Sequence, residues 1–286
     1  MLDQILERFT SVDPRTKVPA DVLSPHIMGK SISNPDVNKK LYTGILPPSL
    51  VKNKTILDLG SCVFLSGAWS LYHGAKHVTG VDMDINFNKI ANDTMIEFFD
   101  SNWKTVEQSI ETFISNNNEQ YDIILIAGTL HKILDKTNLL LWCTEHSDYV
   151  IIEGNYPPVY QYLLGKEQWW EDIDNEVYKT MYSNQDKQFI SNLLESEVYG
   201  EWFLDFIENK LPVYQYSAKT NNIEYSTPKY NWANASTYTS PNYYKHFFSF
   251  KGWGYNSQHS EYLSQNVPEY YTFPRRYCMG FSKGNG

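Results

Sequence analysis

Short apolar runs separated by segments of helical length organise the first half of the chain. Continuous apolar runs of five or six residues are typical of strands that are buried on both faces of a parallel sheet. Strands that alternate with helices predict a parallel sheet covered by helices. The five candidate strands are Thr55–Leu59, Val78–Asp82, the start of Lys104–Glu111, Tyr121–Ile126 and Tyr149–Glu153.

The first two runs end in residues that are typical of a nucleoside-binding βαβ unit. Asp58 and Gly60 close the first run, and Asp82 closes the second, 22 positions after Gly60. A glycine lets the backbone turn tightly and approach a ligand, while a carboxylate at the end of the second strand can accept both hydroxyls of a ribose. The spacing therefore predicts a nucleoside site at this edge of the sheet.

Asp58 and Gly60 also distinguish between two kinds of cofactor. Nicotinamide dehydrogenases usually place glycine where Asp58 stands, because a carboxylate would repel the phosphate there. An acid at this position favours a ligand with an ammonium group. The pattern resembles class I S-adenosylmethionine-dependent methyltransferases, whose first motif reads roughly Asp/Glu-x-Gly-x-Gly-x-Gly. The chain departs from that motif at Cys62 and Phe64, which take the two later glycine positions.

The resemblance implies a fold and a set of site residues. The fold is α/β, a Rossmann-like, seven-stranded, mostly parallel sheet with an antiparallel last strand and helices on both faces. The cofactor is S-adenosylmethionine, and the loop Ala127–His131 lies under its methyl group. Asp58 and Gly60 border the methionine moiety, and His131 is a candidate general base because histidine titrates near neutrality. The full set of predicted cofactor residues is Asp58, Gly60, Ser61, Cys62, Asp82, Met83, Ser109, Ile110 and Ala127.

The predicted division of the chain is a leader and cap at residues 1–48, then a methyltransferase domain at 49–286. The spacing of Leu2, Ile5, Leu6 and Phe9 predicts an amphipathic helix that packs on the sheet or covers the site. The proline-, serine- and asparagine-rich stretch 19–48 predicts a loop-dominated approach to the first strand. Strands at Pro212–Tyr216 and Arg276–Phe281 would close the sheet, with an aromatic-rich insertion at about 217–274 between them.

Composition is consistent with a cytoplasmic enzyme. The chain has 286 residues, of which 42% are hydrophobic and 20% charged. No apolar run approaches the length of a membrane span, and acidic residues interrupt any signal-peptide pattern in the first ten residues. Three scattered cysteines predict free thiols rather than a disulfide framework or zinc cluster. The pair His73 and His77 lacks an accompanying carboxylate pattern, so no metal is predicted.

Charge and aromatic residues leave the methyl acceptor open. The net charge of −9 disfavours a polyanion and favours a small molecule or sugar. Residues 225–286 nevertheless contain six basic and two acidic residues among many aromatic ones. RNA is therefore the alternative acceptor, bound through Lys245, Lys251, Arg275 and Arg276. Otherwise Trp253 and Tyr255 would line a small-molecule pocket. A third class is a non-catalytic protein whose cofactor loop has degenerated at Phe64.

Overall fold

The computed structural model describes residues 1–13, 34–133, 135–156, 215–218, 236–239, 241–271 and 276–284. Within these ranges the strands are β1 (Thr55–Leu59), β2 (His77–Asp82), β3 (Trp103–Glu107), β4 (Tyr121–Ala127), β5 (Ser147–Asn155), β6 (Gln215–Ala218), β7 (Ser236–Thr239), β8 (Trp253–Asn256) and β9 (Arg276–Lys283). The helices are α1 (Leu2–Val12), α3 (Pro35–Ile45), α4 (Pro48–Val51), α5 (Leu65–Tyr72), α6 (Ile85–Met95), α7 (Ile110–Asn116), the 3₁₀ turn η2 (Leu130–Lys132), α8 (Lys136–His146), α13 (Pro241–Phe250), α14 (Gln258–Asn266) and α15 (Pro268–Tyr271).

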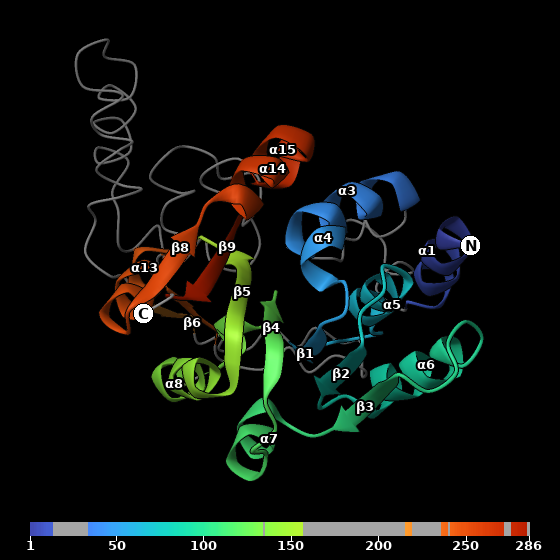
Figure 1. Cartoon of the computed structure of the whole chain (residues 1–286), viewed down its shortest axis with the longest axis horizontal. Helices are drawn as coiled ribbons and strands as arrows, with labels where there is room; N and C mark the ends of the chain where they lie inside the picture. The colour runs from blue at the N-terminus through green and yellow to red at the C-terminus, as the bar shows by residue number, and fades with distance from the viewer. Residues whose placement is uncertain are drawn as a thin grey trace.

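Seven of the strands form one sheet in the order β3-β2-β1-β4-β5-β9-β8 (Figure 1). Strands β1 to β5 are parallel, and β9 is antiparallel to both of its neighbours. The strand order reverses between β1 and β4, which makes the crevice outside their carboxyl ends the place where open α/β sheets bind ligands. The predicted seven-stranded, mostly parallel sheet with an antiparallel last strand is confirmed.

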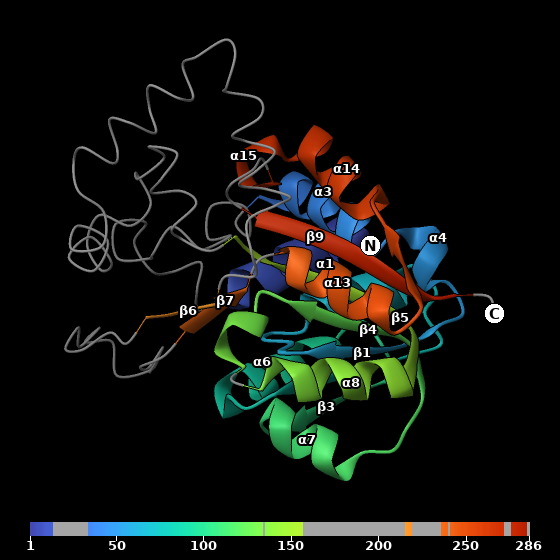
Figure 2. The ribbon, with the colours of Figure 1, turned by 90° about the vertical axis from the view of Figure 1, so that its left-hand side faces the viewer.

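Helices cover both faces of the sheet, as the alternation of buried side chains requires. Leu57 and Ile124 belong to the core on the side of α7, α8 and α13, whereas Ile56 and Ile123 face α1, α3, α5, α6 and α14. Figure 2 shows α7 and α8 on one side of the sheet and α3 and α14 on the other. Strands β1, β4 and β5 are therefore covered on both faces, which explains their largely apolar sequences.

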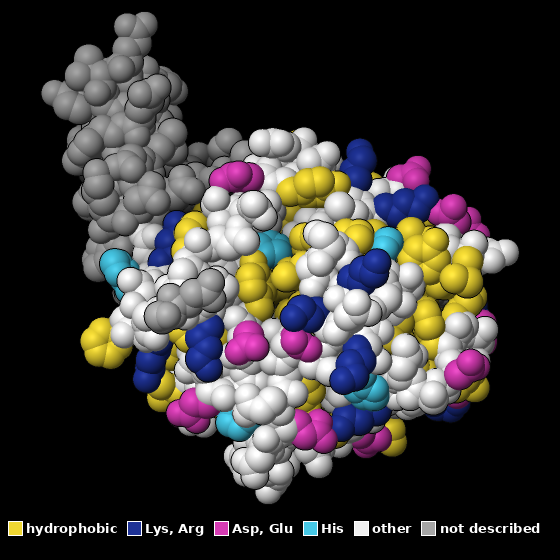
Figure 3. Space-filling view, viewed as in Figure 1, with side chains coloured by type: hydrophobic (Ala, Val, Ile, Leu, Met, Phe, Trp, Pro, Cys, Tyr) yellow, Lys and Arg dark blue, Asp and Glu magenta, His cyan; other side chains and the backbone are white. Residues whose placement is uncertain are grey.

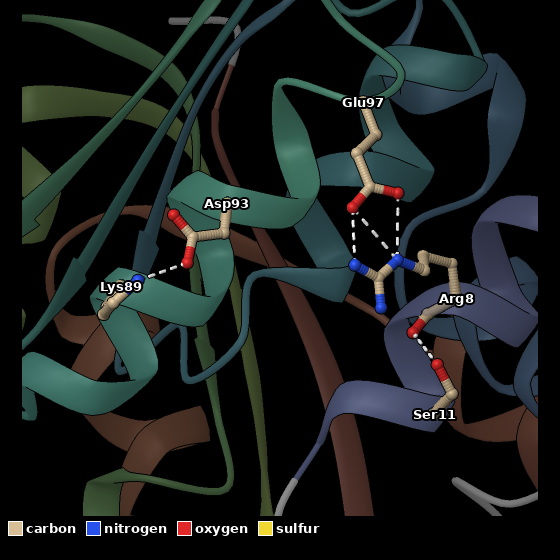
Figure 4. A network of polar contacts seen from close by, with 5 residues as sticks. All are labelled: Arg8, Ser11, Lys89, Asp93 and Glu97. Carbon is tan, nitrogen blue, oxygen red and sulfur yellow. Dashed lines mark hydrogen bonds and ion pairs between the residues drawn. The ribbon is translucent and has the colours of Figure 1, made fainter.

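The amphipathic N-terminal helix is confirmed, and it packs on other helices. Ile5, Leu6 and Phe9 are buried in α1, which contacts α3, α5 and α6. The Arg8 guanidinium donates from Nε to Glu97 Oε2 over 2.9 Å and from Nη2 to Glu97 Oε1 over 2.5 Å, which links α1 to the residues after α6 (Figure 4). Both side chains are more than a third exposed, so the pair orients the helix rather than stabilising it strongly.

The prediction that residues 19–48 are mostly loop is wrong for the second half of this range, which contains α3. Asn34 is the N-cap of α3, and its side chain accepts hydrogen bonds from the backbone N–H groups of Asp36 and Val37. Pro35 stands at the first helical position, where its fixed φ favours a helix start. The many asparagine and proline residues of this stretch predict a loop, whereas Asn34 and Pro35 begin a helix.

The predicted strand Pro212–Tyr216 does not close the main sheet, although its described residues, Gln215 and Tyr216, do lie in a strand, β6. The edge strand next to β9 is β8, while β6 pairs with β7 in a separate two-stranded sheet. Helix α13 and β8 join the main core through Tyr244, Phe248 and Trp253. The range 217–274, predicted as an insertion between the last two strands, therefore includes α13, β8 and α14 of the main fold. The division of the chain at residue 48 stays a prediction, and residues 212–214 of the predicted strand lie outside the described residues.

Candidate functional site

The loop after β1 borders the crevice where the strand order reverses. Its backbone adopts positive φ angles at all three positions where the motif has glycine. The φ angles of Gly60, Cys62 and Phe64 are +84°, +48° and +67°. The backbone N–H groups of Gly60 and Ser61 donate to the Val81 carbonyl oxygen over 2.8 and 3.1 Å, which ties the loop to β2. Two non-glycine residues thus adopt a left-handed conformation that costs each of them about 1–2 kcal/mol. Strain of this kind persists where the surrounding structure enforces it.

The Phe64 side chain points away from the crevice and into the core. It is fully buried, and a Cβ on Gly67 or Gly80 would lie 2.5 or 2.6 Å from its ring carbons. The ring occupies space that exists only because these two residues lack side chains. Phe64 therefore replaces a motif glycine without filling the ligand crevice.

Asp82 connects the ends of β1 and β2. Its Oδ2 accepts a hydrogen bond from the Cys62 backbone N–H over 2.8 Å, and its Oδ1 accepts one from the Asp84 N–H over 2.9 Å. These two bonds hold the carboxylate at the carboxyl ends of β1 and β2, the edge where open α/β sheets bind ligands. The neighbouring Met83 side chain is 75% exposed, an apolar surface beside this carboxylate.

Asp58 is a buried carboxyl group below the loop. It is 3% exposed and accepts a hydrogen bond from the Ser66 hydroxyl at the start of α5. Burial raises the pKa of Asp58 to about 7, an effect that the Ser66 hydroxyl opposes and the charge of Asp82 reinforces. A buried acid with a raised pKa gains from a cationic partner, so this position suits an ammonium group.

Ser61 contributes a buried polar atom to the same loop. Its hydroxyl oxygen has no hydrogen-bond partner among the described residues, although its side chain is only 7% exposed. Buried polar groups are normally paired, so an unpaired one in a ligand-type loop is consistent with a partner supplied by a ligand.

The loop after β4 meets the loop after β1. A Cβ on Gly60 would overlap the Thr129 hydroxyl and lie 2.8 Å from Thr129 Cβ and Cγ2. Ala127 is half-buried at the end of β4, and His131 is half-buried in η2. The structure therefore brings Ala127 to the Gly60 edge and places His131 two residues beyond the contact with Gly60. Thr129 lies within the predicted loop Ala127–His131, but the sequence predicts no role for it.

The two predicted residues after β3 serve the fold directly. The Ser109 hydroxyl accepts a hydrogen bond from the Thr112 N–H and caps α7. The Ile110 side chain is 6% exposed and belongs to the hydrophobic core. Any contact of Ile110 with a base would have to use its backbone rather than its side chain.

A buried ion pair missed by the sequence analysis lies behind the loop after β4. Arg276 donates from Nε and Nη2 to Glu153 Oε1 and Oε2 over 2.5 and 2.7 Å, and the Tyr271 hydroxyl donates to Oε1 over 3.1 Å. Glu153 is 1% exposed and Arg276 8%. A Cβ on Gly128 would lie 3.8 Å from each of these charged groups. Arg276 is therefore engaged inside the protein, contrary to its predicted role in gripping phosphates.

Two further predictions about the C-terminal segment are corrected. Trp253 is buried against Phe248, and its partner in β9 is Lys283, at the end of β9 opposite Arg276. Trp253 and Tyr255 thus lie toward the amino edge of the parallel strands, away from Gly60 and Asp82. Neither residue lines a pocket at the cofactor edge, and Arg275 lies outside the described residues.

Two lysines near His131 have pKa values altered by their surroundings. Burial lowers the pKa of Lys132, and it lowers the pKa of Lys136 to about 8. Lys136 is 4% exposed and donates from Nζ to the Ile133 carbonyl oxygen over 2.7 Å. Both lysines follow the loop after β4 in the chain, Lys132 within η2 and Lys136 at the start of α8.

The cysteine prediction is confirmed, since all three thiols are free, with Cys143 and Cys278 buried and Cys62 half-buried. Across the described ranges, no group of three His, Cys, Asp or Glu side chains is arranged to hold a metal ion. In the same part of the chain, no helix is long and apolar enough to cross a membrane.

Comparisons with known proteins give structural neighbours only. No family model and no curated protein matches the sequence. A proposed S-adenosylmethionine-dependent methyltransferase from Listeria monocytogenes is 14% identical, with a TM-score of 0.47 over 87% of this chain and 100% of its own. A proposed RNA methyltransferase from Pyrococcus horikoshii is 23% identical, with a TM-score of 0.36 over 46% of this chain and 67% of its own. The bifunctional kinase-methyltransferase WbdD is 21% identical, with a TM-score of 0.36 over 42% and 28%.

The strand order defines the fold class of this chain. An order of β3-β2-β1-β4-β5-β9-β8, with only β9 antiparallel and with helices on both faces, is the class I methyltransferase fold. The loop after β1 keeps the backbone of that fold's first motif, although two of its three motif glycines are replaced.

Proposed function

We propose that this protein is an S-adenosylmethionine-dependent methyltransferase that acts on a small-molecule or sugar acceptor. The observation that supports it most is the link between the two strand ends, where the Cys62 N–H donates to Asp82 Oδ2 beneath a loop with three left-handed residues. This arrangement gives a close backbone approach beside a carboxylate, as a nucleoside requires.

The residues present fit this cofactor. Asp58 and Gly60 would hold the methionine end, and the unpaired Ser61 hydroxyl could bond to the same moiety. Asp82 would accept the ribose hydroxyls, and the exposed Met83 side chain would cover a face of the adenine. A carboxylate at Asp58, in place of glycine, disfavours a dinucleotide phosphate at that point.

The bound cofactor supplies an electrophilic methyl group on a sulfonium. The protein's task is then to hold the acceptor atom in line with that group at about 3 Å and to exclude other geometries. Asp58 and Asp82 would fix the two ends of the donor. His131 would take a proton from the acceptor hydroxyl or amine where the acceptor retains one.

The charge of the chain supports a small acceptor. The net charge is −9. On the face drawn in Figure 3, basic and acidic side chains are interspersed rather than gathered into one basic surface. Extended nucleic acids are usually bound through many lysine and arginine contacts. RNA is the alternative acceptor, and salt-dependent micromolar binding to RNA that is lost on replacing Lys245 and Lys251 would favour it.

Calorimetry with S-adenosylhomocysteine tests the proposal without knowledge of the acceptor. Binding to the folded state raises the melting temperature, and a ligand at one hundred times its dissociation constant stabilises the protein by about 2.7 kcal/mol. A nicotinamide dinucleotide is the matched comparison and should give no shift. Absence of both heat and thermal shift with millimolar S-adenosylhomocysteine would remove the methyltransferase assignment and favour the non-catalytic class.

A further inference from the structure

Thr129 lies in the crevice where the strand order reverses, against the glycine that opens the first motif. The loops after β1 and β4 face each other across this crevice, which is where sheets of this class bind ligands. Because a Cβ on Gly60 would overlap the Thr129 hydroxyl, the two residues are in direct contact. Any ligand group that reaches Gly60 from the crevice must therefore meet the Thr129 side chain.

The Thr129 hydroxyl is engaged with a backbone acceptor of the same loop. Its Oγ1 donates to the Ala127 carbonyl oxygen over 3.2 Å. The side chain makes no capping bond to η2, whereas the Thr129 carbonyl accepts from the Lys132 N–H over 2.8 Å. The Gly128 N–H is held by the Glu153 carbonyl over 3.0 Å. The backbone around Thr129 is thus held by hydrogen bonds in which the half-buried Thr129 side chain takes no part.

The hydrogen bond of Thr129 uses an acceptor that an ammonium group would seek. An ammonium has three donors and no acceptor, and it gains most from carbonyl and carboxylate oxygens. Ala127 ends β4, next to the loop whose Thr129 contacts Gly60, and the Thr129 hydroxyl donates to the Ala127 carbonyl oxygen.

We propose that Thr129 is a residue of the cofactor site that competes with the ligand, because its hydroxyl takes one of the two acceptor positions of the Ala127 carbonyl oxygen, to which the ammonium end of the methionine moiety would also donate. This inference rests on the proposed function and adds a residue that lowers the affinity of the cofactor site for its ligand. Threonine at this position weakens binding of ligands with an amino-acid end and leaves ligands without one unaffected.

Two probes and three variants test the role of Thr129. S-adenosylhomocysteine has the ammonium group, and 5′-methylthioadenosine keeps the nucleoside but lacks the amino-acid end. Replacing Thr129→Ala removes the competing hydroxyl, and a typical net hydrogen-bond contribution corresponds to binding that is roughly two- to tenfold tighter. Thr129→Ser retains a hydroxyl and should bind like the parent. Thr43→Ala is the matched control, since the Thr43 hydroxyl bonds to the Lys39 carbonyl in α3.

The expected result is tighter binding of S-adenosylhomocysteine by Thr129→Ala alone, with equal affinities of all four proteins for 5′-methylthioadenosine. Unchanged or weaker binding of S-adenosylhomocysteine by Thr129→Ala would overturn the inference, as would an equal gain for both probes. If the parent binds S-adenosylhomocysteine in that case, only the role of Thr129 fails. If neither the parent nor Thr129→Ala binds it, the proposed function fails as well.

Discussion

The ring of Phe64 packs directly on Gly80, so that a Cβ at Gly80 would lie 2.6 Å from two of its ring carbons. Phe64 belongs to the loop after β1, and Gly80 is in the middle of β2. The contact holds a left-handed phenylalanine at a position where the motif of this fold has glycine. The shape of the cofactor loop therefore depends on a glycine in the neighbouring strand.

Gly80→Ala should destabilise the protein by about 1–3 kcal/mol, because the added methyl overpacks a filled core. It should also weaken binding of S-adenosylhomocysteine, since the displaced ring moves the loop. Urea denaturation and calorimetry measure the two effects. Gly254→Ala is the control, as its Cβ would have contacts no closer than 3.8 Å. Equal stability of the two variants would show that Phe64 does not depend on Gly80.

Asp58→Asn should stabilise the protein at pH 8 while it weakens cofactor binding. The folded pKa of Asp58 is raised to about 7, above the unfolded value near 3.9. The stabilising effect of its proton is fully present below about pH 4 and is lost as the pH rises to 7. The ionised group then costs on the order of 4 kcal/mol.

Urea denaturation of parent and Asp58→Asn between pH 4 and pH 8 measures this effect. The difference in unfolding free energy should be small near pH 4, grow toward pH 7 and stay constant above it. A difference that is independent of pH would mean that Asp58 is ionised in the folded protein throughout this range.

Much of the central sheet could be predicted from the sequence, and the reasons are local. Strands such as β1 and β4 are buried on both faces, so their sequences are mostly apolar. Residues suited to ligand binding stand at or just after their carboxyl ends. Strand β8 has only four residues, two of them exposed, and its position depends on packing against β9. The segment Pro212–Tyr216 has a stronger strand pattern, and its last two residues do lie in a strand, but that strand is β6 of the separate two-stranded sheet.

Residues of the candidate site could be predicted only where a residue type at a given position in the chain has one usual function. Asp58, Gly60 and Asp82 follow from strand ends and spacing. The contacts of Thr129 with Gly60 and of Arg276 with Glu153 join residues 69 and 123 positions apart, and no local pattern indicates them. The path of Phe64 could not be predicted either, because it depends on two glycines on different elements.

Removing one partner of the ion pair of Glu153 and Arg276 should lower the free energy of unfolding strongly. Replacing both partners by apolar residues should lower it much less. Arg276→Met leaves Glu153 charged and buried, and we expect a loss of 3–5 kcal/mol in unfolding free energy as an order of magnitude. The double variant Glu153→Leu with Arg276→Met should recover most of that loss, because two apolar side chains replace two desolvated charges.

The exposed pair Arg8 and Glu97 is the matched control for this cycle. Arg8→Met should cost less than about 1 kcal/mol, since both partners are solvated. Urea denaturation of the parent and of these three variants measures the differences. A double variant as unstable as Arg276→Met alone would mean that the charges at Glu153 and Arg276 are not the main energetic term.

Binding of S-adenosylhomocysteine to Asp82→Ala tests the central claim most directly, because Asp82 joins the two strand ends that define the site. Asp84→Ala is the control, since Asp84 caps α6 through the N–H groups of Asn86 and Phe87 and its loss should mainly lower stability. A charge-assisted hydrogen bond contributes roughly 1.5–3 kcal/mol. Calorimetry should therefore show more than a tenfold loss of affinity for Asp82→Ala and little change for Asp84→Ala. Parent-like affinity of Asp82→Ala would contradict a ribose site at this carboxylate.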